Sequence, residues 1–221
     1  MYKTELHLHN AAISRCAHTT DEEIVARYEQ AGYTTLVLTN HFSRSSFKAR
    51  DYASYEDFVH QFWQAGTRLE ALSGGRLRVL TGAEVRFDTN NNDYLVFGAT
   101  EAMMLENQEI FWCGGLRNFR PFADEHGLLV YQAHPFRDGM TVVKPEWLDG
   151  MEVFNGHPGH DARNPIALLW AERFGLRRIS GTDRHNPDHD PVGGIVTDQK
   201  IETMDELVRT LRAGNYTLLT R

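Results

Sequence analysis

The chain has little cysteine, no excess of positive charge and no long apolar run. Only Cys16 and Cys113 occur among its 221 residues, which excludes a disulfide framework and a cysteine-rich zinc site, and a reducing cytoplasm is the expected compartment. The formal net charge is −7, which argues against a nucleic-acid partner because binding a phosphate backbone needs a basic face. No apolar stretch approaches the roughly 20 residues of a membrane span, so no membrane is expected as a partner.

Length and composition predict one globular domain over residues 1–221. Hydrophobic residues make up 41% of the chain and charged residues 24%, which is ordinary for a globular protein. The sequence shows no internal repeat. The chain is long for a small α/β unit and suits a single barrel.

Strand-like and helical segments alternate along the chain. Apolar runs predict strands at 4–9, 35–39, 77–85, 94–98, 128–133, 151–154, 178–181 and 216–219. Helical spacing and capping residues predict helices at 20–32, 55–75, 164–175 and 203–214. Strands that alternate with helices are typical of parallel strands covered by helices, in an open sheet or a closed barrel.

Side chains capable of metal binding or proton transfer stand at the ends of the predicted strands. The segment TELHLHN places His7 and His9 on one face of the first strand, because side chains two residues apart share a face. Two such imidazoles side by side are costly unless a shared cation lies between them. Later strands end in further candidates: His41, Glu84, His134, Glu152, Asn155, His157, His160, Asp183 and His185. A site that draws on so many strand ends favours a barrel over an open sheet.

These imidazoles and carboxylates predict a hydrolase that binds several ions of Zn, Mn or Fe. Not every histidine is expected to take part. His60 and His126 lie in or near helices and are expected to be ordinary surface residues.

The strand-end motifs resemble those of the polymerase and histidinol phosphatase family, usually called PHP. The matching segments are ELHLH, TNHF, GAE, AHPFR, and GTDRH followed by DPVGGI, in the family's order over nearly the whole chain. The resemblance implies a distorted (β/α)7 TIM-like barrel with a metal cluster at the C-terminal ends of its strands. It also implies a metal-dependent phosphoric ester hydrolase that holds two or three divalent ions.

The resemblance further implies how the ions share their ligands. The first ion would be bound by His7, His9, Glu84 and Asp183. The second would be bound by Glu84, acting as a bridge, and His134. The third would be bound by His41 and His185.

Three positions depart from the family pattern. The family's ligand to the third ion after His-x-His is missing, so Cys16 or His18 substitutes for it or the position is vacant. Asp93 stands where many relatives carry a histidine ligand to the second ion, and we expect it to coordinate through oxygen. Asn40 replaces an aspartate that would orient the imidazole of His41, which predicts weaker binding of the third ion.

The implied mechanism uses ions about 3.5–4 Å apart to deprotonate a bridging water, which then attacks phosphorus. Arg137 is the candidate for binding the phosphate, with Arg15 as an alternative, whereas strand alternation points Arg184 away from the site. His185 or His157 would protonate the leaving group.

The expected partner is a small phosphorylated metabolite in a pocket that short loops cover, at 42–54, 99–118 and 155–164. Four aromatic residues in these regions could stack on a base or sugar, or simply pack in the protein: Phe47, Tyr52, Phe111 and Trp112. Two other functions stay open. One is hydrolysis of amide or cyclic ester bonds by the same ions, and the other is a degenerate domain that keeps metal without turnover.

Overall fold

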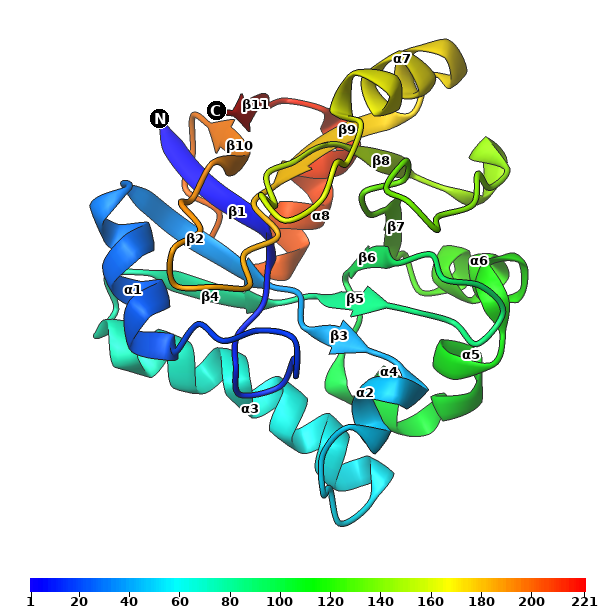
Figure 1. The fold of residues 1–221 in the computed structure, drawn as a ribbon, viewed down its shortest axis with the longest axis horizontal. Helices are drawn as coiled ribbons and strands as arrows, with labels where there is room; N and C mark the ends of the chain where they lie inside the picture. Colours follow the sequence, from blue (N-terminus) through cyan, green and yellow to red (C-terminus); the bar gives the residue numbers. More distant parts are fainter.

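The computed structural model describes residues 1–221, and its strands form a ring with most of the helices outside it (Figure 1). The strands are β1 (Tyr2–Leu8), β2 (Tyr33–Leu38), β3 (His41–Phe42), β4 (Arg78–Thr81), β5 (Ala83–Val85), β6 (Tyr94–Phe97), β7 (Leu129–Gln132), β8 (Gly150–Asn155), β9 (Arg177–Gly181), β10 (Gly193–Thr197) and β11 (Thr217–Thr220). The helices are α1 (Asp21–Gln30), α2 (Arg44–Lys48), α3 (Tyr55–Ser73), α4 (Glu101–Glu106), α5 (Gln108–Trp112), α6 (Gly115–Glu125), the 3-10 turn η1 (Pro145–Trp147), α7 (Asn164–Phe174) and α8 (Met204–Ala213).

The strands form two sheets that continue into each other. One sheet has the order β11-β10-β1-β2-β4 and the other has the order β3-β5-β6-β7-β8-β9. Only Gly82 separates β4 from β5, so the two act as one bent strand that runs from the first sheet into the second. A bridge between Leu8 and Arg184 joins the end of β1 to the segment after β9 and closes the ring. The predicted distorted α/β barrel is therefore confirmed.

Two strands run against the direction that the sequence pattern predicted. β6 is antiparallel to both β5 and β7, and β10 is antiparallel to β1. The connection from β5 to β6 covers residues 86–93 without a helix, which is too short for the crossover of a dozen or more residues that parallel strands need. β10 itself was missed, because Gly193 and Gly194 weaken the strand signal at its start.

Residues 99–118 are mostly helical and do not form the loop that the sequence predicted. They include α4, α5 and the start of α6, and both Phe111 and Trp112 are buried. Phe47 and Tyr52 are half-buried and stack on each other with ring centroids 6.2 Å apart. All four rings pack against other residues of the protein, which is the second of the two roles expected from the sequence.

α8 fills one end of the barrel, behind the strands in Figure 1. Its Leu207 and Leu211 are fully buried. They join a cluster of strand residues that includes Leu6, Val37, Leu95, Leu129, Ile179 and Ile195. The capping boxes that were predicted at Thr20 and Thr203 are both formed. Because apolar side chains occupy this end, polar groups that face the barrel axis are left to the opposite end.

Phe42 belongs to the other, larger hydrophobic cluster of the protein. Its ring is fully buried against Phe58, Phe62 and Phe111. Phe42→Ala should lower the free energy of unfolding by about 3–5 kcal/mol, because the cavity cannot close completely. Phe174→Ala, at a residue that is 45% exposed, should cost less than about 1 kcal/mol. Urea denaturation of both variants checks this, and equal losses would contradict the packing described.

Candidate metal centre

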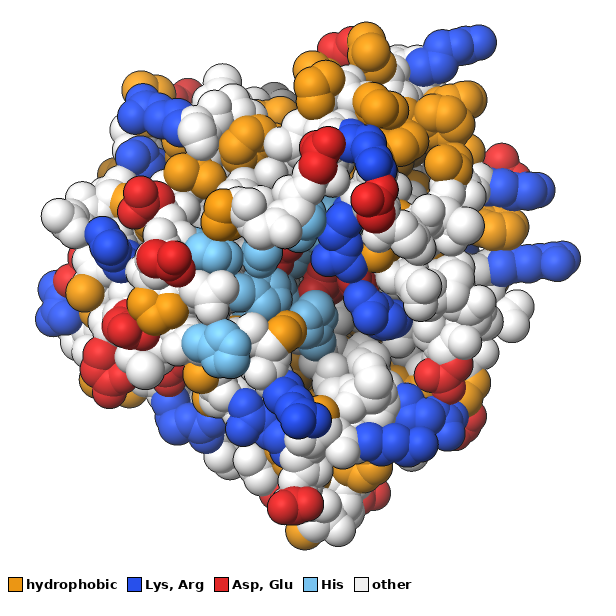
Figure 2. All heavy atoms as spheres, in the orientation of Figure 1, with side chains coloured by type: hydrophobic (Ala, Val, Ile, Leu, Met, Phe, Trp, Pro, Cys, Tyr) orange, Lys and Arg blue, Asp and Glu red, His pale blue; other side chains and the backbone are white.

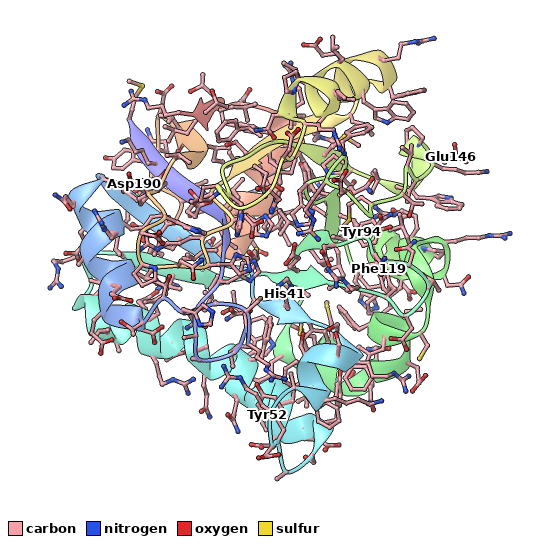
Figure 3. All side chains as sticks on the ribbon, in the orientation of Figure 1. His41, Tyr52, Tyr94, Phe119, Glu146 and Asp190 are labelled. Atoms are coloured by element: carbon pink, nitrogen blue, oxygen red, sulfur yellow. The ribbon has the colours of Figure 1, made fainter.

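Side chains from several strand ends meet at the open end of the barrel. They are His7 and His9 on and after β1, His41 on β3, Glu84 on β5, His134 after β7, and Asp183 and His185 after β9. Histidines gather at the middle of this face, around a hollow with acidic groups at its base (Figure 2). His41 lies near the centre of the same view (Figure 3).

The atoms at the middle of the cluster approach each other closely. His7 Nε2 lies 3.1 Å from His9 Nε2, and each lies 3.3 Å from Asp183 Oδ1. Glu84 contributes one oxygen 3.3 Å from His7 Nε2 and another 3.4 Å from His9 Nε2. His134 Nε2 lies 3.1 Å from Glu84 Oε1. Glu84 is therefore placed between the two sides of the cluster, as a bridging ligand would be.

Hydrogen bonds behind His7 and His9 turn one nitrogen of each ring toward the middle. His7 Nδ1 lies 2.9 Å from Glu152 Oε1, and an ionised carboxylate only accepts, so Nδ1 carries the proton. His9 Nδ1 lies 3.2 Å from Ser14 Oγ, which gives its own proton to Asn40 Oδ1 at 2.8 Å. Both Nε2 atoms are left to bind an ion or a proton at the centre.

Several buried atoms in the cluster lack a hydrogen-bond partner. They are Glu84 Oε2, Asp183 Oδ1 and His134 Nδ1, although Glu84 Oε2 lies only 2.6 Å from His41 Nδ1. Buried polar atoms without partners are costly. Divalent ions among these nitrogen and carboxylate atoms would satisfy them, so the residues fit a centre with more than one metal ion.

The charges in the cluster favour a cation. Burial raises the pKa values of Glu84 and Asp183, but neighbouring histidines outweigh it and hold both pKa values well below their usual range. Burial lowers the pKa of His7, but nearby carboxylates, Asp183 first, raise it well above its usual range. Protons on the histidines balance the carboxylates, and metal binding would release those protons.

Cys16 reaches the outer side of the cluster. Burial raises the pKa of its thiol, but hydrogen bonds with His185 and His41 bring that pKa down to about 6, so the group is largely thiolate at pH 7. His185 Nδ1 lies 3.0 Å from the carbonyl oxygen of Asp183 and donates to it, so Nε2 is the nitrogen left for Cys16 or for an ion. His18 is exposed and belongs to none of the groups whose ligand atoms converge.

Asp93 is buried at the edge of the cluster, where Arg86 pairs with both of its oxygens. Arg86 Nε lies 2.7 Å from Oδ1, and Nη2 lies 2.5 Å from Oδ2. Asp93 also converges with His41 and Glu84 and lies 3.8 Å from His134 Nε2. An ion at this position would share Asp93 with the guanidinium group.

Glu152 supports the cluster from behind and does not face its middle. Besides the contact with His7, its carboxylate accepts hydrogen bonds from the backbone N–H of His134 at 2.8 Å and from Asn155 Nδ2 at 3.0 Å. Asn155 also donates to Asp183 at 3.1 Å. One carboxylate thus links the side chain of His7 on β1, the backbone of His134 after β7 and the side chain of Asn155 on β8.

The sequence analysis missed Glu5, a buried carboxylate that lies two residues before His7 on the same face of β1. It accepts from the N–H groups of Leu6 and His7, from the hydroxyl of Tyr28, and from both N–H and hydroxyl of Thr182. The spacing could have revealed it, because residues 5, 7 and 9 alternate with leucines and therefore share one face of the strand. Glu5 ties β1 to the segment that carries Asp183.

Asn40 makes no hydrogen bond with the imidazole of His41. Its carbonyl oxygen accepts from Ser14 Oγ at 2.8 Å and from the N–H of Asn10 at 3.0 Å. Through Ser14 it orients His9 instead. Weaker binding of an ion at His41 stays a prediction.

The backbone is strained at two of the cluster residues. His134 has φ +27° and Asp183 has φ +54°, values that non-glycine residues rarely adopt. Their N–H groups are held by Glu152 Oε2 and by the carbonyl oxygen of His7. At Gly181 a Cβ atom would lie 2.3 Å from Cβ of His7, so only glycine allows β9 to approach this closely. Strain that persists at such positions is typical of functional sites.

The sequence-predicted candidates for proton transfer lie at the rim. His157 stacks on His160 with ring centroids 4.4 Å apart and lies 5.2 Å from the ring of His185. Burial, helped by the charge of His185, lowers the pKa of His157 to about 4, so the ring is neutral at pH 7. Its Nδ1 accepts from the N–H of Gly159 at 2.9 Å. The proton is therefore on Nε2.

Two of the arginines considered for phosphate binding are placed very differently. Arg137 Nη2 lies 3.5 Å from Asp93 Oδ2 at the border of the cluster. Arg184 is fully buried and donates to the carbonyl oxygens of Pro187 and His189. Arg184 therefore does not reach the site.

Comparison with known proteins finds likeness in structure only. No family model matches the sequence, and no curated protein does. A two-domain protein from Bacteroides vulgatus that contains a predicted PHP-like metal-dependent phosphoesterase matches with TM-score 0.71 and 18% identity. The match covers 100% of this chain and 65% of that one. The chain has a PHP-type fold.

The same PHP-type fold occurs in proteins of other stated activities. Endonuclease Q, in complex with a 27-mer duplex substrate that has an abasic lesion at the active site, matches with TM-score 0.66 and 11% identity over 96% of this chain and 56% of that one. An amidohydrolase from Chromobacterium violaceum with bound sulfate matches with TM-score 0.54 and 15% identity over 99% and 98%. The chain thus spans just over half of the endonuclease. No helix here has the length and apolar character needed to span a bilayer.

Glu152→Gln should weaken metal binding by roughly 10-fold to 100-fold, because the neutral amide makes His7 a poorer ligand. Competition between the protein and a chelator for Zn²⁺ measures the affinity. Glu146→Gln is the matched control, since that side chain is 68% exposed and pairs only with Lys144. Equal affinities in the two variants would show that Glu152 does not support the metal centre.

Proposed function

We propose that the protein is a metal-dependent phosphoesterase that hydrolyses a small phosphorylated metabolite. The observation that carries the proposal is the buried cluster in which His7, His9, Glu84 and Asp183 turn nitrogen and oxygen atoms toward one another, with one oxygen of each carboxylate lacking a hydrogen-bond partner. Likeness in fold to a protein with a PHP-like phosphoesterase supports it.

In this proposal the ligands divide into three groups. The first ion would be bound by His7, His9, Glu84 and Asp183. The second would be bound by Glu84 and His134, with Asp93 beside them. The third would be bound by His41 and His185, with Cys16, which hydrogen-bonds to both rings, as a further ligand.

Ions bound there would lower the pKa of a water molecule and neutralise charge on the phosphoryl oxygens. Arg137, at the border of the cluster, would hold those oxygens in position. His157 is neutral, carries its hydrogen on Nε2 and would donate a hydrogen bond to the leaving oxygen, which would take its proton from water. A His185 ring that binds an ion through Nε2 could not make this hydrogen bond, so His157 is the better hydrogen-bond donor of the two.

Hydrolysis of amide or cyclic ester bonds is the second candidate function. Likeness in fold to the amidohydrolase supports it, and the same ligands would serve because a carbonyl carbon is attacked in the same way as phosphorus. Cations around the histidines favour the phosphoesterase, since an uncharged amide does not need them (Figure 2).

His9→Ala should lower kcat/KM for a phosphoester at least about 1,000-fold, because it removes a ligand from the middle of the cluster. The purified protein with added Mn²⁺ or Zn²⁺ is assayed on phosphomonoesters, phosphodiesters, lactams and a DNA duplex with an abasic site. His60→Ala is the control, because His60 is exposed and pairs only with Glu101.

Activity that His9→Ala retains would refute the metal mechanism. Turnover of lactams alone would favour the second function, and cleavage of the duplex would overturn a small metabolite as the substrate. Fewer than about one tightly bound ion per chain, with no turnover of any substrate, would indicate a degenerate domain.

Cys16→Ser tests whether the thiolate binds an ion. The protein loaded with Co²⁺ should show thiolate-to-metal charge-transfer absorption in the near ultraviolet, which Cys16→Ser should abolish. Cys113→Ser, which removes the other exposed cysteine, should leave the absorption unchanged. A spectrum that Cys16→Ser leaves intact would exclude Cys16 as a ligand, whatever the activity of the enzyme.

A further inference from the structure

A pocket of about 540 Å³ opens beside the cluster. His41 and Cys16 form the wall that it shares with the candidate metal centre. The rest of the lining comes from Arg15, Arg86, Ser43, Ser45, Ser46 and Ala49. Because one wall is common to both, the pocket lies directly beside the candidate metal centre.

The lining contains two arginines and three serines but no carboxylate. A pocket lined by arginines without carboxylates is unusual in a chain with net charge −7. Arg86 is already paired with Asp93, whereas Arg15 is exposed and no acidic side chain pairs with it. An arginine without a carboxylate partner, next to hydroxyl groups, is suited to bind an anion.

The pocket is held in shape by contacts on its outer side. Arg50 donates to the carbonyl oxygens of Ala11 and Ile13 and so fixes the loop that carries Arg15. The hydroxyl of Ser43 lies 2.8 Å from those of Ser45 and Ser46, and any of the three can turn to donate to a ligand. Binding sites arranged in advance lose less free energy on association.

We propose that this pocket binds a second anionic group of the substrate, a phosphate or a carboxylate, while the reacting phosphate lies at the metal centre. The inference rests on the proposed function and narrows it to substrates with two anionic groups. Arg15 is the residue that determines this preference, because its charge is not committed elsewhere.

The test measures binding, so it does not depend on turnover. Isothermal titration of the Zn²⁺-loaded protein compares propylphosphonate, which has one anionic group, with 3-phosphonopropionate and propane-1,3-diphosphonate. Matching titrations into Zn²⁺ buffer correct for chelation. Wild type should bind one of the two-anion ligands about 10-fold more tightly than propylphosphonate, as expected for one charge-assisted hydrogen bond. The tighter of the two identifies the second group as carboxylate or phosphate.

Arg15→Ala should remove most of this preference and leave binding of propylphosphonate unchanged. Arg15→Lys, which keeps the charge, should retain part of it. Arg117→Ala is the control, because Arg117 is also exposed but lies on α6 outside the pocket lining. Equal affinity for all three ligands, or a preference that survives in Arg15→Ala, would overturn the proposal. Tighter binding of a two-anion ligand, without hydrolysis of any phosphoester, would refute the proposed function but would still support the pocket as an anion-binding site.

Discussion

Buried nitrogen and oxygen atoms that face one another without partners are the constraint around which this protein is organised. At the middle of the cluster, His7 Nε2, His9 Nε2 and Asp183 Oδ1 lie about as close as hydrogen-bonded atoms, yet Asp183 Oδ1 has no hydrogen-bond partner. Such a group is stable only if positive charge lies among its members. Protons can supply that charge, but divalent ions satisfy more of these atoms at once. The chemistry proposed here follows from that requirement.

The barrel holds these atoms together by keeping two residues at its rim in strained backbone conformations. Asp183 and His134 adopt positive φ values, and each is held by a hydrogen bond from its N–H group to β1 or β8. Glu152 holds His7 from behind while Asn155 holds Asp183. The opposite end of the barrel is closed by α8, whose apolar side chains pack among those of the strands. Rigidity supplied by that end lets the rim keep a strained and charged arrangement.

Much of the fold and of the cluster could be predicted, because residues close together in the sequence determine them. The alternation of His7 and His9 with leucines fixes their common face, and capping boxes at Thr20 and Thr203 fix two helix starts. Strand direction was harder: the alternation of strands and helices suggested parallel pairing throughout, whereas the short connection of residues 86–93 makes β6 antiparallel to β5. Partners distant in sequence could not be predicted at all. That Asn40 acts on His9 through Ser14 depends on contacts made only in the folded chain.

Arg86 connects the metal centre to the neighbouring pocket. Asp93 is one of the metal ligands expected from the sequence, and Arg86 pairs with both of its oxygens. The same guanidinium group lines the pocket beside His41. An ion bound by Asp93 would compete with Arg86 for the same oxygens, so occupation of that position would free the guanidinium for an anion in the pocket. Without an ion there, the pair neutralises Asp93 and holds Arg86 in place. In the proposed function, the number of bound ions would therefore affect how strongly a second anion binds.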